Sequence, residues 1–187
     1  MGAGNTTLTP DIIRIRGTVG GATTLTRPAD TTAYAAGDEV SNSTTQGSAA
    51  PFVFANAARS AGGGGIIKSV LITSNDPANA MTPALWLFNA APTMVGDNAA
   101  WSLLAADAVN IVSAPVADDP FRRAPAAGGG DTQSIHFTIG PAGAFAGTVE
   151  YTCAATSTSL YGVLIAGNIN TPLNAGTFTV TLTVERR

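Results

Sequence analysis

The amino-acid sequence predicts an all-β protein, an antiparallel β-sandwich of jelly-roll-like type with one short helix near residues 97–106. Short segments of alternating apolar and polar residues recur along the chain, and clusters of Gly, Pro, Asn and Asp separate them. Charged residues make up only 11% of the chain, against about 25% in an average globular protein, and Thr, Ala, Gly and Ser take their place. This composition is not that of a helix-rich enzyme.

We expect one domain over residues 1–187, because a chain of this length can bury a sizeable core without division. No internal repeat or interdomain linker interrupts it. The first eleven residues, "MGAGNTTLTPD", are small and lack core residues of their own. They predict an extended N-terminal segment over about residues 1–11.

Period-two alternation marks the strands that are expected to bury one face in the core and expose the other. Residues 11–19 alternate Ile13 and Ile15 with two arginines, and residues 134–140 place Ile135, Phe137 and Ile139 on one face. Residues 177–185, "TFTVTLTVE", give the strictest pattern, with one apolar face and one face of threonines. The residues expected in the core there are Phe178, Val180, Leu182 and Val184.

Denser apolar runs at residues 66–74, 84–90 and 160–167 predict strands that are covered on both faces. Turn-forming clusters such as "TVGGA" at 18–22 and "AGGGG" at 61–65 are expected to separate the strands. The spacing gives roughly eight strands, as in an antiparallel sandwich or barrel.

Two segments depart from the strand pattern. Residues 96–109 begin with Asp97 and Asn98 and continue with helical apolar spacing, so we expect a short helix capped by one of these two side chains. Residues 118–131, "DDPFRRAPAAGGGD", predict a long exposed loop.

The segment "RPADTTAYAAGDEVSNS", residues 27–43, is rich in turn formers and carries two adjacent acids. We interpret Gly37 as the residue that permits a chain reversal and Asp38 as the side chain that caps it. Arg27 flanks Pro28 in an extended approach, and Tyr34 is expected to pack over a sheet edge. This favours a scaffold over a metal or sugar site.

The sequence offers few candidates for catalysis. His136 is the only histidine, and its alternation with apolar neighbours places it on the polar face of its strand. Cys153, the only cysteine, reads as a small buried residue. The "GGGGIIKS" segment at 62–69 lacks the second glycine of a phosphate-binding loop and runs into a β-branched strand. We therefore predict no catalytic, cofactor or metal residues and no enzyme, although a hydrolase with paired carboxylates stays possible because spatial neighbours are invisible in a sequence.

Read together, four features resemble a group of small virion proteins of tailed bacteriophages. These features are the R-P-x-D-x-T-x-Y-x-x-G-D-x-V pattern from Arg27 to Val40, a strand beginning near Gly65, an L-x-L-F-x-x-x-P strand ending near Pro92, and a D-N-x-x-W segment at Asp97. The similarity covers roughly residues 25 to 185. It implies a structural protein of the particle, either in the capsid or in the tail and its fibres.

From this resemblance we expect a capsid decoration or cement protein on the virion surface, which stabilises the shell by binding the major capsid protein and neighbouring copies of itself as a homo-oligomer. The alternative is a glycan- or receptor-binding module of the tail, with ligand contacts at Trp86, Tyr161, His136 and the 118–131 loop. A depolymerase ranks third. A net charge of −3 argues against nucleic acid as a partner, and no apolar run is long enough for a membrane span.

The residues expected to bind the protein partner lie in the 118–131 loop. Phe121 would be an apolar anchor, and arginine forks favour specific docking on carboxylates. The neighbouring acids add charge of the opposite sign. The predicted partner-binding residues are Asp118, Asp119, Phe121, Arg122 and Arg123.

Overall fold

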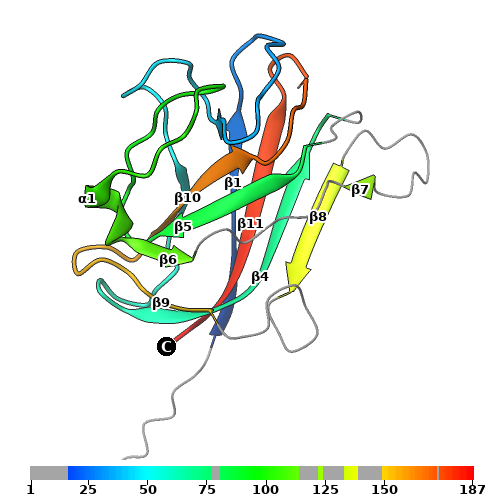
Figure 1. Cartoon of the computed structure of the whole chain (residues 1–187). Helices are drawn as coiled ribbons and strands as arrows, with labels where there is room; N and C mark the ends of the chain where they lie inside the picture. The colour runs from blue at the N-terminus through cyan, green and yellow to red at the C-terminus, as the bar shows by residue number, and fades with distance from the viewer. Residues whose placement is uncertain (1–16, 77–80, 114–121, 124–132, 139–148, 172) are drawn as a thin grey trace, which may run out of the picture.

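The computed structural model describes residues 17–76, 81–113, 122–123, 133–138, 149–171 and 173–187. These residues form eleven strands and one short helix, and the strands build two antiparallel sheets that pack face to face (Figure 1). The prediction of an all-β antiparallel sandwich is confirmed. No helix in these ranges is long and apolar enough to cross a lipid bilayer.

The first sheet has the strand order β1-β11-β4-β8-β7, with β9 also paired to β4. Its long members lie side by side in Figure 1, and β11 occupies a position between β1 and β4. The bounds of its strands are β1 Gly17–Thr26, β4 Gly64–Ser74, β7 Arg122–Arg123, β8 Gln133–Thr138, β9 Val149–Thr152 and β11 Thr177–Arg186.

The second sheet has the order β2-β10-β5-β6, with β3 also paired to β10. It lies across the first sheet in Figure 1. Its strands are β2 Glu39–Val40, β3 Phe52–Phe54, β5 Pro83–Phe88, β6 Ile111–Ser113 and β10 Leu160–Ala166.

The pairing of the strands is nested, as in a jelly roll. The first strand, β1, pairs with the last, β11, while β2 and β3 pair with β10. Further inside the chain β4 pairs with β8, and β5 pairs with β6. Such nesting is produced when one long antiparallel hairpin wraps round a core, which is the architecture of the double-sheet jelly roll. The jelly-roll-like prediction therefore agrees with the strand order.

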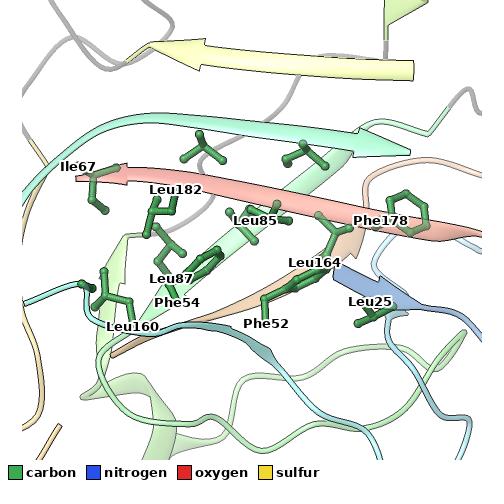
Figure 2. Close-up of a cluster of buried hydrophobic side chains, with 14 of the residues drawn as sticks. Leu25, Phe52, Phe54, Ile67, Leu85, Leu87, Leu160, Leu164, Phe178 and Leu182 are labelled. Carbon is green, nitrogen blue, oxygen red and sulfur yellow. The ribbon is translucent and has the colours of Figure 1, made fainter. Parts of the chain in front are cut away.

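The main core lies between the two sheets and follows the alternation of the sequence. In β11, Phe178, Val180, Leu182 and Val184 are buried, whereas the intervening threonines are partly exposed. Figure 2 shows Leu182 and Phe178 of β11 opposite Leu85 and Leu164 of the second sheet. The period of two thus places one whole face of the strand in the core.

A second apolar cluster covers the outer face of β10 and β5. Val163 and Ile165 of β10 pack there with Phe88 and Met94. Strand β10 is therefore buried on both faces, as its dense apolar run predicts. In β4 only one face is buried, and the residues of the other face are partly exposed or exposed, so the same prediction is wrong for β4.

The structure corrects two local predictions. The helix covers only Ala105–Ala108, begins after Leu104, and has no side-chain cap. Asn98 has a positive φ of 59°, which a helix does not allow, so no helix starts at 97–98. The "TVGGA" cluster is not a break but lies within β1, because β11 pairs with it along its whole length. Residues 11–16 of the first expected strand lie outside the described residues.

We predict that Leu182→Ala lowers the free energy of unfolding by about 2–5 kcal/mol, because a buried leucine would leave a cavity between the sheets. Thr181→Ala, on the partly exposed face of the same strand, is the matched control and should change it by less than about 0.5 kcal/mol. Urea unfolding followed by tryptophan fluorescence measures both. Equal losses in the two variants would contradict the assignment of faces in β11.

Candidate functional site

A cluster of buried polar side chains lies at the end of the sandwich where β1 leaves the first sheet. The chain segments that meet there follow β1, precede β2, follow β5, and connect β10 to β11. Arg27 is the first residue after β1, Tyr34 forms an isolated antiparallel bridge with Asn170, and Asp97 lies in the segment after β5. We call Arg27, Tyr34 and Asp97 the loop junction.

Asp97 is the centre of the loop junction. Its Oδ2 accepts a hydrogen bond from Nη2 of Arg27 at 2.8 Å, and the side chains of both residues are fully buried. Its Oδ1 accepts from the hydroxyl of Tyr34 at 2.6 Å and from the backbone N–H of Ser41 at 2.9 Å. The carboxylate thus binds two residues of the connection between β1 and β2 and one residue that follows β2.

Arg27 uses the rest of its guanidinium group in the same way. Nε donates to the hydroxyl of Tyr34, and Nη1 donates to the carbonyl of Leu173 at 3.3 Å. The guanidinium carbon also lies 4.7 Å from the centre of the Tyr34 ring. Asp30, whose side chain is 30% exposed, is a more distant ion partner at 3.5 Å.

Glu39 lies beside the loop junction and is fully buried in β2. Its two carboxylate oxygens accept the backbone N–H groups of Val95 and Gly96 at 2.8 and 3.1 Å. Gly96 has a φ of 118°, and a Cβ there would lie 2.9 Å from the carbonyl oxygen of Thr44. Only glycine fits this approach, so the segment after β5 is held close to β2.

The turn before β2 has the structure that the sequence predicts. Gly37 has a φ of 95°, which glycine adopts without steric cost. The carboxylate of Asp38 accepts the backbone N–H of Ala35 at 2.6 Å, so it caps the turn. The predicted chain reversal at Gly37 and its cap by Asp38 are confirmed.

Burial and neighbouring charges shift the pKa values at the loop junction. Burial alone would lower the pKa of Arg27, but Tyr34 and Asp97 outweigh it and raise that pKa. Burial raises the pKa of Tyr34 far above its usual range, and the charge of Asp97 adds to the effect. Tyr34 is therefore a neutral donor at every physiological pH. Burial also raises the pKa of Glu39, against the opposing hydrogen bonds of Val95 and Gly96.

The chemistry of the loop junction is that of a structural joint. The hydrogen-bonding groups of Arg27 and Asp97 are engaged within the chain, and both side chains are inaccessible to solvent. A substrate would have to displace these partners. Within the described ranges no three His, Cys, Asp or Glu side chains gather in a way that could hold a metal ion.

Three of the five predicted partner-binding residues, Asp118, Asp119 and Phe121, lie outside the described ranges. Arg122 and Arg123 form β7, which pairs with β8 at the edge of the first sheet. These two residues are therefore in a short strand and not in a loop, because backbone pairing with Ser134 and Gln133 extends the sheet by one strand.

The other residues considered from the sequence have the following places. His136 lies in β8 opposite Leu71 of β4. Cys153 is buried, as predicted for a small core residue, and burial raises the pKa of its thiol. Lys68 lies in β4, where the register with β11 shifts, and its exposed side chain forms an ion pair at 3.0 Å with the partly buried Glu185. The "GGGGIIKS" segment leads into a strand, so it has no phosphate-loop geometry.

Trp86 and Trp101 are partly buried in the outer cluster of the second sheet. Their ring centres are 5.2 Å apart with planes at 49°, and Trp101 meets Phe88 edge-on at 6.4 Å. Tyr161 packs against the same cluster. The tryptophans therefore serve as packing residues that hold the segment after β5 against the sheet.

The loop junction was not identified from the sequence, although its members were. The sequence predicts an extended approach at Arg27, packing of Tyr34 over a sheet edge, and a helix cap at Asp97 or Asn98. The last assignment is wrong, since Asp97 bonds to Arg27 and Tyr34. The signal that could have found the joint is the presence of a cation, a tyrosine and an acid in turn-rich segments of a chain that is otherwise poor in charge.

No protein-family model matches the chain, and no curated protein matches its sequence. The functional interpretation therefore depends on the residues and geometry described above.

We predict that Asp97→Ala lowers the free energy of unfolding by about 3–5 kcal/mol, because it leaves the buried guanidinium of Arg27 without its counter-ion. Asp30→Ala removes the other carboxylate near the same guanidinium, and should cost less than about 1 kcal/mol because Asp30 is partly exposed. Urea unfolding measures both variants. Similar losses would show that Asp97 has no special role.

We also predict a pH effect of Glu39. Because its pKa is raised in the folded protein, the native state keeps this proton at pH values where the unfolded chain has lost it. The contribution of Glu39 to stability therefore falls as the pH rises from about 4.3, the ordinary glutamate value, to the raised value.

The test compares the free energy of unfolding of the wild type and Glu39→Gln at a series of pH values. Their difference should shift in favour of the variant across this window and become constant above it. Glu150→Gln, at an exposed position, controls for the loss of one carboxylate. Parallel profiles for the wild type and Glu39→Gln would refute the prediction.

Proposed function

We propose that this protein is a structural component of a tailed-bacteriophage virion, and that it decorates the capsid by binding the major capsid protein and neighbouring copies of itself. Its mechanism is binding without chemistry. A rigid sandwich adds buried area between shell subunits, and this stabilises the assembled shell by mass action.

The observation that carries the proposal is where the structure places the residues on which the resemblance depends. The features that resemble phage virion proteins include Arg27, Tyr34 and Asp97, and these three form the buried loop junction. The pattern on which the resemblance depends therefore encodes a joint that fixes loops, which is what a scaffold with a binding surface needs. A catalytic motif would instead present reactive groups to a cleft.

The fold is compatible with this role by analogy alone. Double-sheet jelly rolls occur in viral capsid proteins and also in lectins. Fold does not determine function, so the analogy supports both the capsid role and the glycan-binding alternative. The packing of Trp86 against Trp101 removes ring surface that a sugar platform would use, and this favours the capsid role.

The test measures thermal rupture of purified particles with and without the protein. Particles that carry it should rupture at a higher temperature, and labelling should locate it on the head. Location on the tail together with binding to host glycans would instead establish the alternative function. Glycan turnover that depends on a carboxylate would establish an enzyme.

We predict that the triple variant Phe121→Ala, Arg122→Ala, Arg123→Ala keeps its fold but binds the particle at least about tenfold more weakly, about 1.4 kcal/mol. Removal of one apolar anchor and two arginine forks explains the loss. The control, Leu104→Ala, Arg59→Ala, Arg187→Ala, removes one large apolar side chain and two arginines from exposed positions in the described part of the chain. Normal occupancy by the first variant would place the partner surface elsewhere.

A further inference from the structure

The sheet edges of this protein differ in how they are protected against added strands. Natural sheets blunt their edges with short strands, charges, prolines or bulges. Within the described residues, β7 has two residues and both are arginines, β2 has only two residues, and β6 has three residues beside a register shift. Each of these edges is blunted in one of the usual ways.

Strand β1 lacks these protections. Its ten residues, "GTVGGATTLT", contain no charge and no proline, and they pair with β11 in one unbroken register. In the described part of the chain β1 pairs with β11 alone and ends the strand order of its sheet. About half of the main-chain N–H and C=O groups of an antiparallel edge strand point away from its neighbour, so β1 offers a row of groups for a further strand.

A groove runs beside this edge and has room for the side chains of an added strand. It has a volume of about 370 Å³, with Thr23, Thr24, Leu25 and Thr26 of β1 on one side, and Asn42, Pro51 and Phe52, from the segment after β2 and the start of β3, on the other. An added strand would place alternate side chains in the groove and the others on the outer face. The residues of β1 on that outer face, such as Gly20, Ala22 and Thr24, are small and exposed.

We propose that β1 pairs antiparallel with β1 of a second copy of this chain, so that the two first sheets join into one continuous sheet across a two-fold axis. Antiparallel pairing of a strand with itself satisfies two-fold symmetry, because each residue contact occurs twice. A strand without charge carries no like-charge repulsion when it meets its own copy. It also offers no charge by which a basic or acidic partner would be selected.

This inference rests on the proposed function, which includes binding between copies, and it names β1 as the surface through which the copies bind. It is tested on the purified chain without any particle. A monomeric chain would therefore overturn the inference and leave the virion proposal standing. A dimer through β1, formed by a protein that is absent from virions, would support the inference and overturn the virion proposal.

The first experiment measures association by sedimentation equilibrium over a wide range of concentrations. We expect a monomer–dimer equilibrium, and Gly20→Lys, Ala22→Lys should weaken it at least tenfold because like charges would meet near the axis. An added Cβ at Gly20 has no atom within 4 Å, so the monomer tolerates the change. The control Thr181→Lys, Thr183→Lys places two lysines on the same face in β11, opposite Ala22 and Gly20, and should leave association unchanged.

The second experiment is a positive test by cross-linking. Single cysteines at Gly20, Ala22 and Thr24, in a Cys153→Ser background, should give a disulfide-linked dimer for at least one position under mild oxidation, and that position locates the axis. Thr181→Cys should give none. A chain that stays monomeric at all concentrations, or cross-links equally from β1 and β11, would overturn the proposal. Loss of particle binding by the lysine variant of a monomeric chain would also overturn it, and would assign the edge to a strand of another protein.

Discussion

The buried ion pair of Arg27 and Asp97 is the interaction on which the ordered loop end of this sandwich depends. Removing two charges from water costs several kcal/mol per ion, and direct attraction offsets this only when the other hydrogen-bonding groups are also satisfied. Here Tyr34, Ser41 and Leu173 supply those partners. The pair is therefore stable only when all the segments are in place, and this makes the joint cooperative.

The position of the joint suits the topology of the jelly roll. Nested pairing brings the first strand beside the last, so the loops at the end of the sandwich come from distant parts of the sequence. Arg27 leaves the first strand, Asp97 is seventy residues further along, and Leu173 precedes the last strand. Hydrophobic packing between the sheets is not directional. The ion pair and its hydrogen bonds add the directional contacts that fix how the loops lie on one another.

Much of the fold could be predicted from the sequence, because the signal of a half-buried strand is local. The alternation of residues 177–185 determines which face of β11 is buried, and the apolar run at 160–167 reports that β10 is covered on both faces. The failures have non-local causes. The glycines at 18–22 read as a break, yet pairing with β11 holds them in β1. Asp97 reads as a helix cap, but its partners are residues 27, 34 and 41, which no local pattern brings near.

The use of charge links this architecture to the proposed role. Five of the twelve acidic residues, Asp38, Glu39, Asp76, Asp97 and Asp107, are buried in the described part of the chain. They bond to backbone N–H groups and to Arg27 and Tyr34, so the surface carries fewer charges than the composition suggests. A surface with few charges limits repulsion between copies at close range. The buried acidic residues thus fix the loops from within. They also leave an exterior with few charges, including the uncharged edge of β1, and such a surface suits dense packing of identical subunits.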